Sequence, residues 1–494
     1  MFMALMFTLL PLYYSDNYYD ILNDKNYIFA LFSKILIVAV FATLIVSLIG
    51  NIPKKTLKEC ITGEIKSISF LDILMVCFSA VTVISLCLSP DFENSWSGGA
   101  AWHVGAYIIL LGMVVYFIIS RCFSGKPDIW AYLYLGSLAV LLIGVIDRLG
   151  YDFLVMHDEI PLQYNIFIST IGNVNFWAAY LSIIVPFFML APVFFKSRLS
   201  RFLAHIFLLI AYFSLFITLA NTTYLGIGVA ALFVIWYSLK DVKRLKNLAL
   251  NGVLFTIAGI AADVLWKHPN LIARPIDTDT MSLLLLQYKL YLIPGILGIL
   301  LILIVLFTGT RKEPIRVKID SFVEKYLPIA WIVLIAVGII GGICYMVLNY
   351  SMEFLNYRGS IWYFAFHGFL DAGFGQKLIG IGPALLDVVT QEQIAKADFF
   401  VEWNYLYNTA HNDLLEALVT TGILGCAVKV LMYIAPFIMF AKGNEKKTEK
   451  AAVLAALTGF IGQGLVTGPY ILTYAFYIIF LGVMGAYYRM GKTK

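Results

Sequence analysis

The chain has 494 residues, of which 61% are hydrophobic and 13% are charged, and its mean hydropathy is +0.86. Soluble globular domains are about half apolar and about one quarter charged, so this composition excludes an ordinary soluble protein. It predicts an all-α, polytopic integral membrane protein with the lipid bilayer as its surroundings. The net charge of +5 indicates little as a total, and we expect no nucleic acid partner.

We expect neither a cleavable signal peptide nor a disulfide framework. Residues 1–10 lack a basic stretch, and no small-residue cleavage site follows them. Five of the six cysteines lie in or beside apolar segments, and Cys60 lies in a lysine-rich loop. No cysteine pair falls in a predicted external loop and no CxxC motif is present, so we expect no disulfide and no cysteine-bound metal.

Apolar runs predict membrane helices along most of the chain. A helix needs about 20 apolar residues to cross about 30 Å of hydrocarbon. A weaker first segment, residues 1–14, is short and could either span the membrane or lie in the interface. With or without it, we expect 14 or 13 transmembrane helices in a single membrane domain, 1–494, that has no internal repeat. The other predicted helices cover residues 27–50, 68–89, 104–120, 130–146, 174–195, 202–220, 222–238, 248–265, 284–308, 326–348, 412–440, 451–467 and 469–488.

Lysines and arginines gather in alternate loops between these helices. Each basic cluster is separated from the next by an even number of predicted helices, so the positive-inside rule assigns all of them to the cytoplasm. The C-terminus is then cytoplasmic, and so is the N-terminus if the first segment spans the membrane. The intervening loops carry acidic residues and are expected outside. The basic clusters lie within residues 54–66, 196–201, 240–246, 311–325, 442–450 and 489–494.

One external connection, residues 349–411, is much longer than the others. Long loops in a compact fold are usually functional. Within it, the aromatic stretch "YRGSIWYFAFHGFL" (357–370) predicts an amphipathic helix along the membrane surface. The stretch "GIGPALL" (380–386) predicts a glycine turn that opens a short helix with Pro383 in its first turn.

The stretch "YNTAHNDLLEALVTTGILG" (407–425) places polar residues at the start of a predicted membrane helix. Asn412 and Asp413 stand where a helix start favours capping groups, so His411 could be one more interfacial residue of a capped helix. Glu416 lies within the apolar segment, and acidic residues in such segments usually face a polar site. His411 and Glu416 are therefore candidates for function as well as for capping.

Other polar residues are candidates with an ordinary structural alternative. Arg358 is the single arginine of the long loop; it could bind lipid phosphates nonspecifically, but its guanidinium group also suits a diphosphate. Lys289, a few residues into the helix predicted at 284–308, is an external cation that could simply snorkel to the interface. "NTTYLG" (221–226) reads as a tight external turn. The D-x-D triplet at 277–279 resembles a metal-binding motif, but such short matches are common by chance and we set it aside.

Taken in order, these elements resemble the O-antigen ligase and polymerase family. The resemblance spans about residues 170–430, and the final histidine-containing element is its most specific part. The matching elements are "GNVNFWAAYL" (172–181), "NTTYLG" (221–226), "YRGSIW" with Arg358 and Trp362, "GIG" with Gly380 and Gly382, and "HNDLLEALVTTGILG" with His411, Asn412, Leu415, Gly422 and Gly425.

The resemblance implies a metal-independent, GT-C-like membrane glycosyltransferase without a cofactor. Such an enzyme moves a glycan from an undecaprenyl-diphosphate carrier to a hydroxyl of a glycan or glycolipid acceptor, at the outer face of the cytoplasmic membrane. By this resemblance Arg358 binds the diphosphate, and His411 deprotonates or orients the acceptor hydroxyl. Further candidate substrate-binding residues are Lys289, Asn221, Thr222, Asn412, Glu416, Gly380 and Gly382.

The chain departs from the family at the turn of residues 221–223. Many members have Ser-Arg there, whereas this chain has Asn221, Thr222 and Thr223, so a second phosphate-binding arginine is missing. We hypothesise that Lys289 supplies the second cation, because the predicted topology places it at the same depth on the external side.

Three classes of function stay open at this point. A transferase could be a ligase or a repeat-unit polymerase, since the two differ only in the acceptor. A transporter or flippase for lipid-linked sugars would share the many helices, although it would be expected to show two similar halves and charges in mid-membrane. A non-catalytic assembly protein of the cell envelope would leave Arg358 and His411 without a catalytic role.

Overall fold

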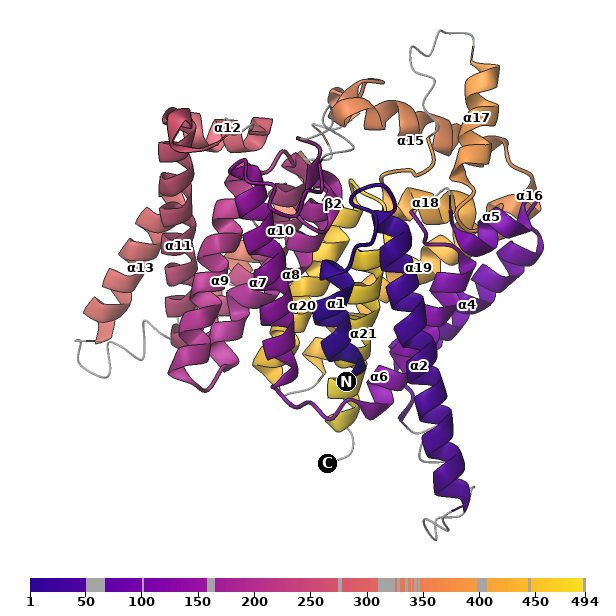
Figure 1. The fold of residues 1–494 in the computed structure, drawn as a ribbon, viewed down its shortest axis with the longest axis horizontal. Coiled ribbons are helices and arrows are strands. Elements are labelled where there is room, and N and C mark those ends of the chain that lie inside the picture. The colour runs from indigo at the N-terminus through magenta and orange to yellow at the C-terminus, as the bar shows by residue number, and fades with distance from the viewer. Residues whose placement is uncertain are drawn as a thin grey trace.

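A computed structural model shows a bundle of α-helices with a layer of shorter helices over one end (Figure 1). The structure describes residues 1–49, 67–99, 102–157, 165–273, 278–309, 347–397, 407–442 and 446–491, together with short stretches between 325 and 344. The one strand pair among these residues is antiparallel, β1 (Phe167–Ile168) with β2 (Gly172–Asn173), in the register Phe167 to Asn173.

The first half of the described chain forms helices of 6 to 29 residues. Its helices are α1 (Phe2–Leu12), α2 (Ile21–Ile49), α4 (Phe70–Cys87), α5 (Phe92–Ser97), α6 (Ala106–Cys122), α7 (Ile129–Arg148), α8 (Val174–Phe194), α9 (Arg198–Ile217) and α10 (Asn221–Ser238). The second half adds the short helices that form the layer over the bundle. Its helices are α11 (Val242–Lys267), the 3-10 turn η2 (Pro269–Leu271), α12 (Thr280–Gln287), α13 (Leu292–Gly309), α15 (Phe354–Asp371), α16 (Phe374–Ile379), α17 (Leu386–Lys396), α18 (Asp413–Thr420), α19 (Gly422–Ala441), α20 (Lys447–Gly464) and α21 (Ile471–Met490).

The expected all-α, multi-pass membrane architecture agrees with these helices. Among the described residues, eight helices are long and apolar enough to cross a membrane, or nine if the bent pair α12 and α13 counts as one span. We expected 13 or 14 spans. Some of the difference comes from α1 and α6, which are apolar but shorter, with 11 and 17 residues. The helix predicted at 326–348 is described only in short stretches, and the basic clusters at 54–66 and 311–325 lie mostly outside the described residues.

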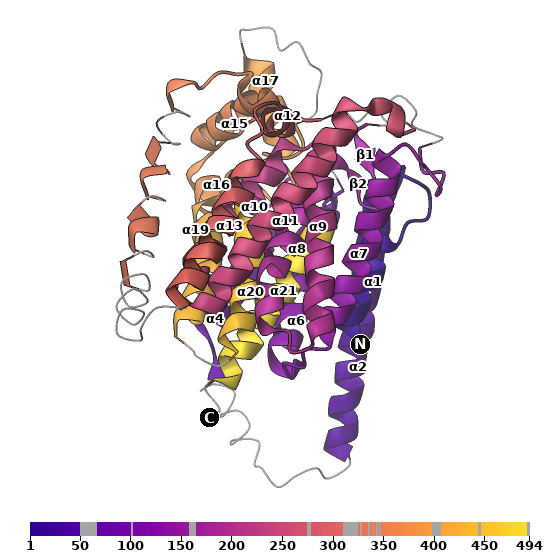
Figure 2. The same cartoon turned by 90° about the vertical axis from the view of Figure 1, so that its left-hand side faces the viewer.

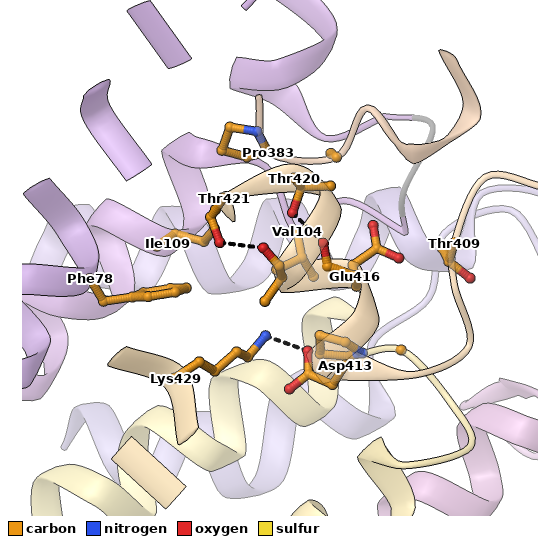
Figure 3. Close-up of a pocket in the computed structure, with 14 residues that line it drawn as sticks. Phe78, Val104, Ile109, Pro383, Thr409, Asp413, Glu416, Thr420, Thr421 and Lys429 are labelled. Atoms are coloured by element: carbon orange, nitrogen blue, oxygen red, sulfur yellow. Dashed lines mark hydrogen bonds and ion pairs between the residues drawn. The ribbon is translucent and has the colours of Figure 1, made fainter. Parts of the chain in front are cut away.

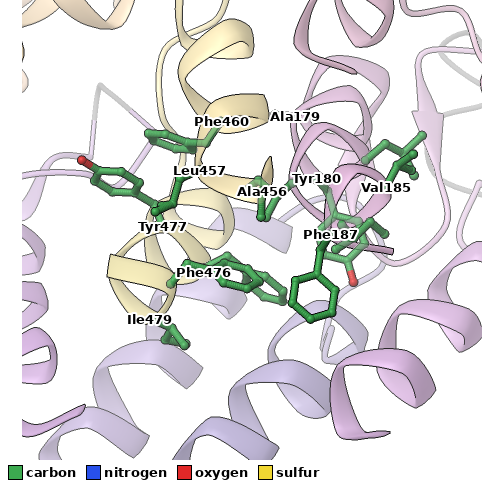
Figure 4. Close-up of a cluster of buried hydrophobic side chains, with 14 of the residues drawn as sticks. Ala179, Tyr180, Val185, Phe187, Ala456, Leu457, Phe460, Phe476, Tyr477 and Ile479 are labelled. Atoms are coloured by element: carbon green, nitrogen blue, oxygen red, sulfur yellow. The ribbon is translucent and has the colours of Figure 1, made fainter. Parts of the chain in front are cut away.

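Helices α8, α20 and α21 form the centre of the bundle (Figure 4). Phe460 of α20 stacks on Tyr477 of α21 with ring centroids 4.3 Å apart. Gly459 lets α20 approach α8 closely, because a Cβ atom there would lie only 1.7 Å from the carbonyl oxygen of Ser182. Small residues commonly permit such close approach between membrane helices. These three helices are therefore the closely packed core below the end of the bundle that carries the short helices.

One end of the bundle collects the described basic loops. Lys243, in the first turn of α11, donates a hydrogen bond to the carbonyl of Val193 in the last turn of α8. Lys446, just before α20, donates to the carbonyl of Gly125 between α6 and α7. The hydroxyl of Tyr237, near the end of α10, donates to that of Thr448 in the first turn of α20 at 3.3 Å, so the basic clusters at 196–201, 240–246 and 442–450 share one end. Figures 1 and 2 place α12, α15 and α17 at the other end.

Two helices that were predicted as continuous are interrupted in the structure. The helix predicted at 412–440 is two helices, α18 and α19, because Gly422 has φ 69°, which a right-handed helix does not allow. The helix predicted at 284–308 is broken into α12 and α13, which are bent by 59°. Lys289 at this break has φ 56°, which again ends the regular helix.

The long connection at 349–411 contains three helices, α15, α16 and α17, and its residues 398–406 lie outside the described residues. Residues 355–357 at the start of α15 have positive φ, so the regular right-handed part of this helix begins at Arg358. The expectation that Pro383 opens a helix is wrong. Gly382 and Ala384 have φ 122° and 62°, so the turn continues until α17 begins at Leu386. "NTTYLG" also differs from its prediction, since residues 221–226 are the first turns of α10 rather than a loop.

Candidate active site

His411 is the residue directly before the capping residue of α18, and its backbone is held on both sides. The side chain of Asn412 caps the helix, as its Oδ1 accepts hydrogen bonds from the N–H groups of Leu414 (3.1 Å) and Leu415 (3.0 Å). On the other side, a carboxylate oxygen of Glu416 accepts a hydrogen bond from the N–H of Ala410 at 2.6 Å. His411 itself has φ 45°, a left-handed conformation that needs such support.

An ion pair fixes α18 to α19 (Figure 3). The carboxylate of Asp413, only 1% exposed, pairs with the ammonium group of Lys429 and accepts a hydrogen bond from the hydroxyl of Tyr433. Asp413 and Glu416 line a small cavity of about 50 Å³ with Lys429. Burial raises the pKa of Glu416 to about 7. The polar residues that follow His411 therefore hold α18 in place.

Arg358 and Asn412 bind neighbouring carbonyl groups in the turn that follows α20. Arg358 Nε donates to the carbonyl oxygen of Val466 at 2.7 Å, and Asn412 Nδ2 donates to that of Leu465 at 3.1 Å. A second bond runs from Arg358 Nη1 to the carbonyl of Leu355 at 2.9 Å. These two bonds use two of the five N–H donors of the guanidinium group. The turn thus brings the side chain of Arg358 and the backbone of His411 together.

The charge of Arg358 acts on the imidazole of His411. Burial, together with the positive charge of Arg358, lowers the pKa of His411 to about 3. Burial also lowers the pKa of Arg358, although a guanidinium group stays charged in proteins. The site therefore combines a permanent cation with a neutral imidazole at physiological pH. Among the described residues, no hydrogen-bond partner meets the buried Nδ1 atom of His411.

The imidazole of His411 faces an aromatic cluster and lines a pocket. Its ring lies edge-on to Trp102, with centroids 5.1 Å apart and an interplanar angle of 70°. Trp102 contacts Phe176 in the same manner at 5.3 Å, and Phe176 stacks on Tyr470 at 4.3 Å. The pocket has a volume of about 380 Å³ and is lined by His411 together with residues from three other places in the chain. These include Tyr18, Asp20, Trp102, His103, Asn173 and Asn175.

Lys289, Asn221 and Thr222 lie elsewhere. Lys289 forms an ion pair with Asp263 of α11, and Figure 1 places α12 and its turn on the opposite side of this end from α15. Asn221 accepts a hydrogen bond from the N–H of Met281 at 2.8 Å, which ties α10 to α12. The hydroxyl of Thr222 is buried without a partner among the described residues. The structure does not bring Lys289 to Arg358.

Gly380 and Gly382 pack the loop against the end of α18. The N–H of Gly382 donates to the carbonyl of Thr420 at 3.1 Å. A Cβ at Gly380 would lie 2.2 Å from that same carbonyl oxygen. Both residues also have positive φ, 86° and 122°. Close packing and backbone conformation therefore account for both glycines.

Sequence reasoning missed Trp102, His103 and the segment Tyr18–Asn23. None of them belongs to a recognisable motif, and they reach His411 only through the folding of distant segments. Asn173 directly precedes the helix predicted at 174–195, and its Oδ1 accepts from the N–H of Asn175 at 2.8 Å to cap α8. The two asparagines lie at the pocket because α8 starts at this end of the bundle.

The described residues contain no group of three histidine, cysteine or acidic side chains placed to hold a metal ion. Asp279 of the D-x-D triplet caps α12, since its Oδ1 accepts from the N–H of Ser282 at 2.6 Å. Asp277 lies outside the described residues.

The fold defines the class of protein: a multi-pass α-helical membrane protein with a polar pocket at the end opposite its described basic loops. No protein-family model matches the chain, and no curated protein matches it.

Proposed function

We propose that this protein is a membrane glycosyltransferase of the O-antigen ligase type. It transfers a glycan from an undecaprenyl-diphosphate carrier to an acceptor hydroxyl at the outer face of the cytoplasmic membrane, in the assembly of a cell-surface polysaccharide. The observation that carries the proposal is that Arg358 and Asn412, the residue after His411, bind adjacent carbonyls of the turn at Leu465 and Val466. Through that turn, a diphosphate-binding cation and a proton acceptor become neighbours.

The orientation of the bundle supports an external reaction. Arg358 and His411 lie at the end opposite the described basic loops, and the positive-inside rule assigns those loops to the cytoplasm. Helix α8 has 21 residues and runs from one end of the bundle to the other. At 1.5 Å per residue its length is about 31 Å, which matches the thickness of the hydrocarbon core of a bilayer, about 30 Å. The diphosphate of a carrier in the outer leaflet would lie near the level of Arg358.

The reaction needs charge stabilisation more than a strong base. The acceptor oxygen attacks the anomeric carbon, the bond from that carbon to the phosphate oxygen breaks, and its electron pair leaves with the diphosphate. Arg358 stabilises the negative charge on the departing oxygens through its remaining N–H donors. Attack from the face opposite the leaving group inverts the configuration at the anomeric carbon.

His411 takes the hydroxyl proton as the new bond forms. In the free protein its pKa of about 3 makes it a weak base, because it is buried beside a positive charge. A bound diphosphate would neutralise Arg358 and so raise the pKa of His411 in part, while burial, the larger cause of its low pKa, would remain. Donor binding thus makes His411 a better base when the acceptor is to be deprotonated, and general base catalysis of this kind contributes about 10²–10⁴-fold.

The test uses purified full-length protein with an undecaprenyl-diphosphate-linked oligosaccharide and a panel of candidate acceptors. We expect a new glycosidic bond with wild type, its persistence in EDTA, and its loss in His411→Ala. An acceptor that is itself a carrier-linked repeat would identify a polymerase. Movement of the glycan across liposomes without a new glycosidic bond would overturn the proposal.

A further inference from the structure

We propose that the pocket beside His411 binds a neutral, hydroxylated sugar unit of the acceptor, and that the connection between α1 and α2 forms one of its walls. The assignment of this sugar to the acceptor rests on the proposed function. The binding of a neutral sugar is argued from the geometry and chemistry of the pocket alone. No residue before position 170 belongs to the family resemblance, so this wall is a separate feature of the chain.

The charge of the pocket disfavours the diphosphate. Its lining contains one carboxylate, that of Asp20, and no lysine or arginine. Burial lowers the pKa of His103, so this second imidazole is also neutral at physiological pH. Arg358 lies beside His411 but does not line the pocket. We therefore expect an anionic ligand to bind at Arg358 and an uncharged ligand to bind in the pocket.

The polar groups of the pocket suit hydroxyl groups. Three asparagine side chains, Asn23, Asn173 and Asn175, supply both donors and acceptors. Asn23 Nδ2 donates to Asp20 Oδ1 at 3.0 Å, which orders these two side chains in advance. The structure gives the side-chain amide of Asn175 no hydrogen-bond partner among the described residues, and this amide is therefore open to a ligand.

Aromatic rings complete the lining. Trp102 and Phe176 pack against each other, while Tyr19 is 78% exposed at the pocket. A mostly apolar wall with a few placed polar groups is typical of small-molecule sites. The volume of about 380 Å³ is near the lower end of such sites, about 300–1,000 Å³, and suits one or two sugar units rather than a long lipid chain.

A hydrogen bond fixes the connection between α1 and α2, which forms one wall of the pocket. The hydroxyl of Tyr18 donates a buried hydrogen bond to the carbonyl of Ser169 at 2.8 Å, which ties this connection to the β1–β2 turn before α8. Asp20 and Asn23 follow directly on the same segment. The pocket is thus preformed by four parts of the chain that are far apart in the sequence: residues 18–23, 102–103, 167–176 and His411.

Binding is tested apart from catalysis, by saturation-transfer NMR on the full-length protein with the methyl glycosides of glucose, galactose and N-acetylglucosamine. We expect a signal for at least one glycoside that falls several-fold in Asn175→Ala and in Asp20→Asn. Asn270→Ala changes an exposed asparagine outside the pocket and should keep the wild-type signal. Equal signals in all variants, no signal in wild type, or loss of the signal on adding farnesyl diphosphate would overturn the inference.

Transfer kinetics separate this inference from the proposed function. We expect Asn175→Ala to raise the KM for the acceptor about tenfold while the KM for the carrier-linked donor stays constant. A rise in the donor KM alone would assign the pocket to the donor glycan and overturn the acceptor assignment. If transfer occurs and neither KM changes, the inference fails and the proposed function stands. If the glycosides bind as expected but no transfer occurs, the proposed function fails and the sugar site stands.

Discussion

The guanidinium group of Arg358 acts on the imidazole of His411 through its charge, and this charge adds to burial in lowering the pKa of His411 to about 3. The two side chains come from segments 53 positions apart, and they meet because Arg358 and Asn412 bind adjacent carbonyls in the turn after α20. In the reaction that we propose, this pair couples donor binding to proton transfer.

Replacement of His411 by asparagine should abolish transfer and spare the fold. Asparagine tolerates the left-handed backbone that position 411 adopts at φ 45°, whereas it cannot accept the hydroxyl proton. We expect kcat to fall by about 10²–10⁴-fold with the melting temperature unchanged. The measurement is turnover of the carrier-linked oligosaccharide beside thermal unfolding in detergent. Wild-type turnover in His411→Asn would remove His411 from the mechanism.

The pKa of His411 should depend on Arg358. The Arg358→Gln variant removes the positive charge and leaves burial, so the pKa of His411 should rise from about 3 without reaching that of an exposed histidine. The check is an NMR titration of labelled histidine side chains, with the other five histidines as internal references. An unchanged pKa of His411 in this variant would show that burial alone lowers it.

Acid should destabilise the protein through His411. Its folded pKa of about 3 is below the unfolded value of about 6.5, so the unfolded state binds more protons in that window. The contribution of His411 to the free energy of unfolding is therefore present above pH 6.5 and is lost as the pH falls toward 3. Unfolding curves of wild type and His411→Asn should coincide above pH 6.5 and separate as the pH is lowered through this range, because only wild type loses the contribution of His411.

Lys289→Ala should retain transfer activity, in contrast to Arg358→Ala. The ammonium group of Lys289 pairs with Asp263 rather than reaching Arg358. Matched initial rates at saturating and at limiting donor are the measurement. A loss of activity in Lys289→Ala as large as that in Arg358→Ala would restore Lys289 as the second cation of the donor site.

Lys429→Met should destabilise the protein strongly. It leaves the buried carboxylate of Asp413 without its cation, and removal of one partner of a buried ion pair costs about 3–5 kcal/mol. The double variant Asp413→Asn with Lys429→Met removes both charges and should recover much of that loss. Chemical unfolding in detergent measures both, and equal stabilities of the single and double variants would contradict this account.

Gly459→Ala should lower the free energy of unfolding, whereas Gly228→Ala should raise it. A methyl group at Gly459 meets the backbone of Ser182 on α8, and overpacking of this kind costs about 1–3 kcal/mol. At Gly228 of α10 a Cβ meets open space, so alanine should stabilise the helix by about 0.5–1 kcal/mol. Thermal unfolding of the two variants beside wild type tests both signs.

Much of the helical fold follows from the sequence by itself, since long apolar runs have few alternatives in a bilayer. Hydropathy predicted α2, α4, α7, α8, α9, α11 and α21 within a few residues at most of their ends. Asn173 and Asn412 were predictable as caps because a cap depends on the next two or three backbone N–H groups. His411 and Arg358 were also identifiable, although only through an ordered set of motifs.

Only the tertiary structure decided which polar residues meet. The break at Gly422 and the bend at Lys289 interrupt uniformly apolar runs, and hydropathy does not register a change of φ at one residue. The pairing of Lys289 with Asp263, and the pocket that joins Asp20 and Trp102 to His411, depend on packing between segments distant in the chain. Local sequence determines the helices because their hydrogen bonds are local, whereas a site is made by long-range contacts that come into existence only when the helices pack.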